Sequence, residues 1–300
     1  MNIIFMGTPD FAIPSLEKIF NSGHKLLSVV TAPDKERGRG QNVSFTPVKE
    51  FALKNNIPLL QPARLKDDNF VKSLKELAPD LFVIVAFRIL PREVFSIPAK
   101  GSFNLHASLL PKYRGAAPIQ WSVINGDKET GVTTFALEDK VDTGNIFIQK
   151  KIEILDKDNF GTIHDKLSII GAEAVMETID LINSGKFTLQ DQDDTLASPA
   201  PKIKKENGLI DWNKPAFDVN NLIRGLSPYP GAYFYFKDKL IKIYNTSVNK
   251  ENVLKPGEIL SSNRELVIGC GKYSLNVLEL QQEGRKKLSV SEFLRGFNFS

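Results

Sequence analysis

The chain has 300 residues, of which 42% are hydrophobic and 25% are charged, and its formal net charge is +4. This length exceeds what one hydrophobic core usually organises, so two domains are expected. The composition is that of an ordinary globular protein, and no apolar run approaches the ~20 residues of a membrane span. The single cysteine, Cys270, excludes an intrachain disulfide. We expect it to be a packed, inert thiol and expect the cytoplasm as the compartment.

The N-terminal part predicts alternating strands and helices. Apolar strands are expected at residues 2–6, 26–32 and 80–87, with a helix opening at Asp10 between the first two. A strand–helix–strand unit implies parallel pairing with a right-handed crossover. The turn at residues 7–9 lacks the glycine pattern that a dinucleotide pyrophosphate requires, so a nicotinamide or flavin enzyme is not expected.

Residues 33–46 form a long polar stretch with Lys35, Arg37 and Arg39 set between glycines. One interpretation is a solvated surface loop. The other is a flexible arm that meets phosphate, because guanidinium groups pair with phosphate through two hydrogen bonds. The sequence leaves both open.

The character of the chain changes at residues 190–206, which are polar and contain proline. We expect a linker there, between a catalytic domain (1–189) and a C-terminal domain (207–300). Short strands in the latter predict a small β-barrel. The excess positive charge lies there, with 13 Lys and Arg against nine Asp and Glu, which permits a polyanionic partner. The expected fold class is a Rossmann-like, mostly parallel sheet with helices on both faces, followed by this barrel.

Asn104 and His106 lie at the end of another predicted strand. Side chains alternate along a strand, so these two point the same way, and ligands of open α/β sheets gather at the carboxyl ends of strands. Asp142 follows the next predicted strand and would complete a set suited to acyl transfer. An isolated Asn-x-His pair is more often structural, and the sequence does not show whether Asp142 reaches His106.

The chemistry of these three residues is coherent. Acyl transfer to an amine passes through a tetrahedral intermediate whose oxygen carries negative charge, and the Asn104 amide and a charged imidazole can donate to it. His106, alone or through a water held by Asp142, can carry protons, a role worth ~10²–10⁴ in rate. No cluster has metal-ligand spacing, so no metal is expected. Ser108 lacks a general base, which argues against a covalent serine route.

Six stretches carry a resemblance to a known family. They are residues 6–11, 38–40, 104–119, 131–144, 202–212 and 223–232. With them the chain resembles the folate-dependent formyltransferases over nearly its whole length. The last two stretches resemble those members of the family that act on tRNA and are absent from members that share only the catalytic domain.

The resemblance implies transfer of a formyl group from 10-formyltetrahydrofolate to the α-amino group of methionine on initiator tRNA, for translation initiation. It assigns Asn104, His106 and Asp142 as the catalytic residues, and it makes the C-terminal barrel an oligonucleotide-binding (OB)-like one. The implied donor-binding residues are Ser108, Leu109, Leu110 and Pro111, together with Phe87 and Arg88, where the family usually has tyrosine and glycine. The implied tRNA contacts are Arg37, Arg39, Lys237, Lys239 and Lys242. For each of these lysines taken singly, a solvated surface is the competing interpretation.

Three alternatives remain open. The acceptor could be a small amine, or it could be water, which would make the protein a formyltetrahydrofolate hydrolase. The C-terminal strands and the arginine-containing stretch argue against both, because small acceptors need neither. A tRNA-binding module with an inactive site is the third, and the intact Asn104, His106 and Asp142 argue against it. A monomer with no membrane partner is expected.

Overall fold

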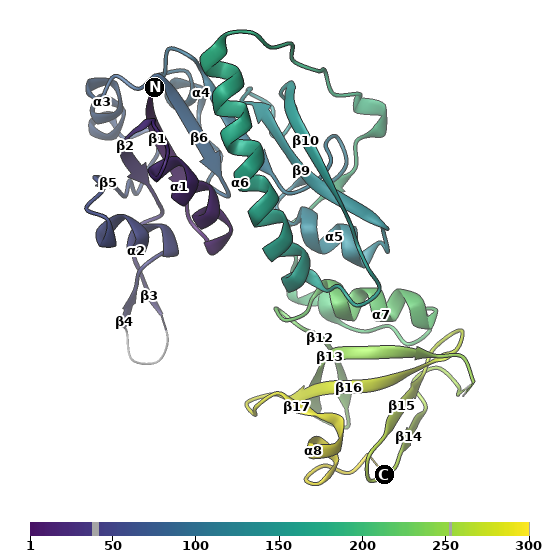
Figure 1. The fold of residues 1–300 in the computed structure, drawn as a ribbon. Helices are drawn as coiled ribbons and strands as arrows, with labels where there is room; N and C mark the ends of the chain where they lie inside the picture. Colours follow the sequence, from purple (N-terminus) through teal and green to yellow (C-terminus); the bar gives the residue numbers. More distant parts are fainter. Residues whose placement is uncertain (38–41, 252–253, 300) are drawn as a thin grey trace. The chain divides into compact units, whose positions relative to one another are not determined.

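The structure is a computed structural model that describes residues 1–37, 42–251 and 254–299 (Figure 1). The chain divides into two compact units. The first comprises Met1–Gly115, Gly131–Ile152 and His164–Pro199, and the second comprises Ala116–Thr130, Glu153–Ile163 and Ala200–Ser300.

The first unit is built on a seven-stranded sheet in the order β10-β9-β7-β6-β1-β2-β5. Its strands are β1 (Asn2–Gly7), β2 (Lys25–Val30), β5 (Leu59–Leu60), β6 (Leu81–Val85), β7 (Ser102–His106), β9 (Glu129–Ala136) and β10 (Ile146–Glu153). β1 pairs in parallel with β2 and β6, and β6 in parallel with β7, whereas β9 runs antiparallel to β7. The predicted α/β class with a mostly parallel sheet is confirmed.

Helices cover both faces of this sheet. They are η1 (Asp10–Ala12), α1 (Ile13–Phe20), α2 (Pro47–Lys54), α3 (Asp68–Glu76), α4 (Arg92–Phe95) and most of α6 (Phe160–Ser184). Ile4 and Met6 alternate with Ile3 and Phe5 along β1, and the first pair packs in one cluster with residues of α3 and α4. Figure 1 shows α1 and α6 crossing the opposite face. Both faces of β1 are therefore buried, which explains its unbroken apolar sequence.

Two local expectations need correction. The flanks of the polar stretch 33–46 are a hairpin and not a loop, because β3 (Lys35–Arg37) and β4 (Asn42–Ser44) pair antiparallel and satisfy each other's backbone groups. Arg39 lies outside the described residues. Asp10, which the sequence predicts as the N-cap that opens the first helix, is instead the first residue of η1, and the N-cap is Pro9. The Asp10 carboxylate accepts the neighbouring backbone N–H of Phe11 at 3.0 Å.

The second unit contains a curled antiparallel sheet in the order β12-β13-β16-β15-β14, with β17 paired to β16. Its strands are β12 (Ala232–Phe236), β13 (Lys239–Asn249), β14 (Ile259–Ser261), β15 (Leu266–Gly269), β16 (Ser274–Gln282) and β17 (Leu288–Ser289), and its helices are α5 (Pro118–Ile124), α7 (Ala216–Gly225) and α8 (Val290–Leu294). The remaining short elements are β8 (Arg114–Gly115) and η2 (Asp194–Leu196) in the first unit, β11 (Pro199–Ala200) at the division between the units, and η3 (Lys205–Gly208) in the second unit. Cys270 lies in the core of this unit, where burial raises the thiol pKa to about 12. The predicted packed thiol is confirmed.

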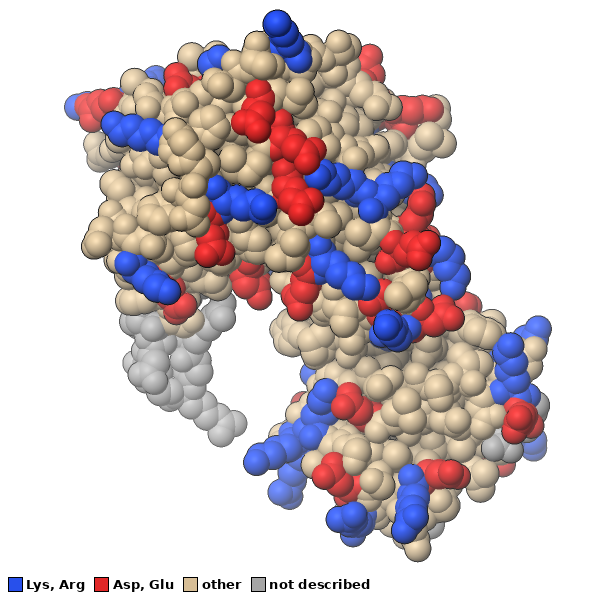
Figure 2. Space-filling model, viewed as in Figure 1, with Lys and Arg blue, Asp and Glu red and all other residues tan. Residues whose placement is uncertain are grey.

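No helix in the described part of the chain combines the length and apolar character needed to cross a bilayer. Figure 2 shows Lys and Arg side chains around the edge of the second unit, with fewer Asp and Glu between them. That distribution agrees with the excess of basic residues after residue 206.

Candidate active site

The end of β7 presents two polar side chains on one face of the sheet. Asn104 and His106 stand two residues apart, so they point the same way, as predicted. Leu105 points to the other face, towards Gly171 of α6. A Cβ at Gly171 would lie 2.7 Å from a Leu105 methyl, so the glycine allows this close approach. The contact between Leu105 and α6 thus fixes the end of β7 from the face opposite to Asn104 and His106.

His106 is held in one orientation by the main chain. Its Nε2 lies 2.8 Å from the carbonyl oxygen of Tyr113, and the side chain is only 7% exposed. Since a carbonyl can only accept, Nε2 carries the hydrogen. Nδ1 then faces the carboxylate of Asp142, with 3.9 Å between Nδ1 and Oδ2. The ring nitrogen that can gain or lose a proton is therefore the one directed at Asp142.

Asp142 sits in a loop whose shape is fixed by three contacts. Its φ is +57°, a left-handed conformation that Asp tolerates better than most residues. Its Oδ2 accepts the backbone N–H of Gly115 at 2.9 Å. The amide of Gln192 donates to the carbonyls of Asp142 (3.0 Å) and Gly144 (2.8 Å), and its oxygen accepts from Arg114 at 2.7 Å. Both the oxygen and the NH₂ group of the Gln192 amide are hydrogen-bonded, so the Asp142 carboxylate is in position before any ligand binds.

An open pocket adjoins these residues. Its lining consists of Ile84, Phe87, Arg88, Ile89, Leu90, Asn104, Phe135, Leu137, Glu138, Asp139, Lys140, Val141 and Asp142. Among the described residues, none forms a hydrogen bond with the side chain of Asn104. The amide of Asn104 is therefore available to a ligand, with the carboxylate of Asp142 on the same wall.

Arg88 forms part of this wall. Its Nη2 donates to the carbonyl of Pro62 at 2.7 Å, and its Nη1 donates to that of Ala63 at 3.1 Å. Burial lowers the pKa of the guanidinium, and its buried Nε has no hydrogen-bond partner among the described residues. Arg88 thus ties the turn after β5 to the wall, and Phe87 lines the pocket beside it. Both were named from the sequence.

The turn at residues 108–111 lies against the site, but its polar groups form hydrogen bonds within the protein. The Ser108 hydroxyl donates to the carbonyl of Lys112 at 2.6 Å. Thr133 links the turn to β9, because its hydroxyl donates to the Ser108 carbonyl and accepts the Leu110 N–H. Leu110 packs against Phe135. Among the described residues that line the pocket, none comes from Ser108, Leu109, Leu110 or Pro111, so their contact with a donor stays a prediction.

The predicted tRNA-binding residues differ in their surroundings. The turn between β12 and β13 carries Lys237 and Lys239, both exposed, with their ammonium groups 5.4 Å and 4.9 Å from the ring centres of Phe236 and Phe297. Lys242 is half-buried and donates to the carbonyl of Pro230 at 2.7 Å. The backbone of Arg37 ends β3, and Arg39 lies outside the described residues.

Sequence reasoning missed the residues that hold the site together. Tyr113 acts through its carbonyl and Gly115 through its N–H, and neither group has a sequence signature. Arg114 stands inside one of the stretches that resemble the family, which was a usable signal. Gln192 had none, because it lies 50 positions after Asp142 in a segment expected to be a linker. In residues 1–37, 42–251 and 254–299, no group of His, Cys, Asp and Glu side chains is arranged to hold a metal.

Comparison with known proteins agrees with this geometry. Residues 1–179 match the profile described as "Formyl transferase", and residues 202–298 match "Formyl transferase, C-terminal domain". The chain belongs to the formyl transferase family. It is 48% identical over 301 residues to a protein of Caldanaerobacter subterraneus subsp. tengcongensis (99% of this chain, 97% of the relative). It is also 48% identical over 295 residues to one of Thermodesulfovibrio yellowstonii (98% and 95%). Both relatives are named methionyl-tRNA formyltransferase.

Solved structures share the fold at lower identity. The N-formyltransferase from Helicobacter canadensis, in complex with folinic acid and dTDP-3-aminofucose, superposes with a TM-score of 0.71. It is 22% identical, and the match covers 92% of this chain and 98% of that one. HypX from Aquifex aeolicus, in complex with tetrahydrofolic acid, gives a TM-score of 0.67 at 17% identity, covering 97% of this chain and 46% of that one. At these identities the likeness supports the fold alone, and both neighbours bound a folate.

Proposed function

We propose that this chain transfers the formyl group of 10-formyltetrahydrofolate to the α-amino group of methionine carried by initiator tRNA. One observation carries the proposal. The Asn104 amide and the Asp142 carboxylate meet at one pocket, and Nδ1 of His106 lies 3.9 Å from that carboxylate. They do so in a chain that matches methionyl-tRNA formyltransferases along its full length. The roles proposed for these three residues follow from their chemistry at that pocket.

The pocket suits the flat ring system of a folate. Phe87, Leu90 and Phe135 give it an apolar wall, and Asn104 and Asp142 add polar groups at one side. Such a lining, mostly apolar with a few convergent polar groups, is what small-molecule sites present. When bound, the donor supplies the formyl carbon. We propose that Phe87 and Arg88 shape its pocket, and that Ser108, Leu109, Leu110 and Pro111 support the site from the adjoining turn.

The reaction needs one bond made, one bond broken and one proton moved. The methionine nitrogen attacks the formyl carbon, and the bond from that carbon to N10 of the donor breaks, leaving tetrahydrofolate and formyl-methionine. Asn104 donates to the oxygen that gains negative charge on the way. The proton lost by the attacking amine is taken up at Nδ1 of His106, beside Asp142, and returned to the departing nitrogen. No metal has a part in this scheme.

Under the same proposal, the basic residues named from the sequence bind the tRNA. Phosphate charge dominates nucleic-acid affinity, so the exposed Lys237 and Lys239 are favourable contacts, and Arg37 and Arg39 are proposed with them. Lys242 is the weakest candidate because it is half-buried and its ammonium is directed at the Pro230 carbonyl. We also propose a monomer, because Asn104, His106 and Asp142 belong to one chain, and a cytoplasmic location, because the proposed acceptor is a charged tRNA.

Release of tetrahydrofolate tests the proposal. The purified protein is mixed with 10-formyltetrahydrofolate and one acceptor at a time. Methionine-charged initiator tRNA should stimulate release, while uncharged tRNA and glycinamide ribonucleotide should not. Stimulation by the ribonucleotide would overturn the choice of acceptor, and release independent of any acceptor would indicate a hydrolase.

A further inference from the structure

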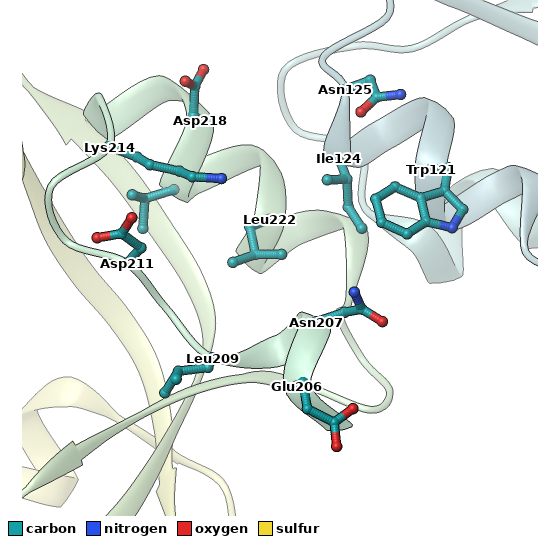
Figure 3. A pocket seen from close by; sticks show the side chains of 11 residues that line it. Trp121, Ile124, Asn125, Glu206, Asn207, Leu209, Asp211, Lys214, Asp218 and Leu222 are labelled. Carbon is teal, nitrogen blue, oxygen red and sulfur yellow. The ribbon is translucent and has the colours of Figure 1, made fainter. Parts of the chain in front are cut away.

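A pocket of about 530 Å³ lies within the second unit and has no part in the chemistry described above. Figure 3 shows α5 and α7 on either side of it, with the segment around residues 206–214 completing the wall. Its surface includes the apolar side chains of Ile124, Leu209, Val219 and Leu222, and the indole of Trp121 stands at one edge. The volume is that of a typical small-ligand site.

The walls of this pocket are fixed by the protein's own hydrogen bonds. The indole N–H of Trp121 donates to the carbonyl of Pro201 at 2.8 Å, which sets the plane of the ring. The side-chain oxygen of Asn207 accepts the backbone N–H of Lys204 at 2.8 Å, so its NH₂ group is the part left for a ligand. A site that is already shaped loses less entropy on binding.

The charge of the lining limits what can enter. Three carboxylates line the pocket, from Glu206, Asp211 and Asp218, and Lys214 is the one cation among its described lining residues. The backbone N–H of Asn213 lowers the pKa of Asp211, so that carboxylate is charged at neutral pH. A free phosphate or carboxylate is therefore disfavoured. Groups that donate hydrogen bonds are favoured, provided that the rest of the ligand is flat or apolar.

We propose that this pocket receives one unstacked adenine or cytosine base of the RNA acceptor. The ring faces of these bases can stack on the indole of Trp121 and pack on the apolar floor. Their exocyclic amino groups can donate to a carboxylate such as that of Asp218. A carboxamide such as that of Asn207 can also pair with the edge of a base. Lys214 extends towards the middle of the pocket (Figure 3) and can donate to an acceptor on the ring edge of the base. The inference rests on the proposed function, because it requires an RNA substrate.

Tryptophan fluorescence provides a direct test. The chain has two tryptophans, and Trp212 packs edge-to-face on Phe234 with 5.4 Å between ring centres, outside the pocket lining. Trp212→Phe therefore leaves Trp121 as a single reporter in the full-length protein. Adenosine and cytidine should quench it, and uridine, which presents a carbonyl where cytidine has its amino group, should bind about tenfold more weakly. Quenching by arginine amide and by no nucleoside would overturn the proposal and assign the pocket to a protein partner.

Two variants connect the pocket to the reaction. Leu222→Trp fills it, and Asp218→Asn keeps its shape while removing an acceptor charge. We expect both to raise KM for charged tRNA severalfold with KM for the folate donor unchanged, and Asp218→Asn to erase the preference for cytidine over uridine. Glu265→Gln, which neutralises an exposed acid outside the lining and away from the turn between β12 and β13, is the matched control. If the parent protein formylates charged tRNA but Asp218→Asn leaves both the KM for tRNA and the base preference unaltered, the pocket does not receive a base, while the proposed function still holds. If the parent shows no tRNA-stimulated release, the proposed function fails.

Discussion

The end of β7 and the turn between β12 and β13 both carry side chains that we propose to meet a substrate, but their construction is opposite. His106 is buried, and every polar contact around it is directional, from the Tyr113 carbonyl to the Asp142 carboxylate. Lys237 and Lys239 are exposed and lie beside aromatic rings, an interaction that tolerates many ammonium positions. We therefore expect the first region to act through geometry and the second through charge. Single substitutions should therefore have large effects at the first and small, salt-dependent effects at the second.

The sharpest test of this contrast is His106→Ala. Without the imidazole, nothing else on β7 can take a proton from the attacking amine, so we expect kcat to fall ~10²–10⁴-fold. Binding of the folate donor, followed by equilibrium titration, should be nearly unchanged because His106 is not among the pocket-lining residues. Turnover like that of the parent protein would remove His106 from the mechanism.

Asn104→Ala should have the next largest effect. Loss of one oxyanion donor typically costs ~10²–10³ in kcat, and Asn104 has no structural hydrogen bond whose loss would disturb the fold among the described residues. The effect should therefore fall on kcat in steady-state kinetics, with the melting temperature unchanged. Asn104→Asp, which replaces the donor by a negative charge, should be at least as damaging. A fully active Asn104→Asp variant would contradict the oxyanion role.

Gln192→Ala tests whether the site depends on its supporting loop. The amide holds the carbonyls of Asp142 and Gly144, so without it the carboxylate should lose its fixed place near Nδ1 of His106. We expect a fall in kcat of about tenfold, in line with the loss of a positioning contact, and a shift in the pH dependence of kcat. Gln192→Glu should behave similarly, since it can still accept from Arg114 but cannot donate to the carbonyls.

Gln190→Ala is the matched control, because the Gln190 side chain is exposed two residues away. It should behave like the parent protein. Equal effects of the two glutamine substitutions would show that the loop contacts of Gln192 are unimportant for catalysis.

The smallest effect is expected at the other region. The double substitution of Lys237 and Lys239 by alanine should raise KM for charged tRNA only a few-fold at moderate salt. The slope of log KM against log salt should flatten by roughly one unit per lost phosphate contact. Lys242→Ala should leave this slope unaltered, because its ammonium already donates to a carbonyl. An unchanged slope in the double variant would show that the turn between β12 and β13 does not contact tRNA phosphates.

The parts of the molecule that sequence predicts well are those with a short-range signal. Apolar runs locate β1 and β6, and side-chain alternation alone puts Asn104 and His106 on one face. The same kind of pattern predicts strands at residues 232–236 and 266–269, and these are the bounds of β12 and β15. These features depend on neighbours within a few residues, which the sequence displays directly.

The contacts that arrange the site could not be predicted in the same way. The partner of His106 is a main-chain carbonyl, and every residue has one, so no residue type identifies Tyr113. Gln192 reaches Asp142 only because the chain returns to β7 after α6, and a glutamine in a polar segment looks like any solvated residue. The Ser108 hydroxyl is a further example, since its bond to the Lys112 carbonyl depends on the local path of the turn.

The hydrogen bonds of Gln192 also limit where the domains of two family members can be joined in a chimaera. A chimaera that joined this catalytic region to another C-terminal domain at residue 189 would keep Asn104, His106 and Asp142 in its sequence. It would nevertheless exchange Gln192, together with Ser198, whose hydroxyl accepts the Tyr113 N–H. A junction placed after residue 199 retains both contacts. The useful crossover point for exchanging acceptor specificity therefore lies about fifteen residues beyond the end of α6 at Ser184, where the chain has finished enclosing the catalytic loop.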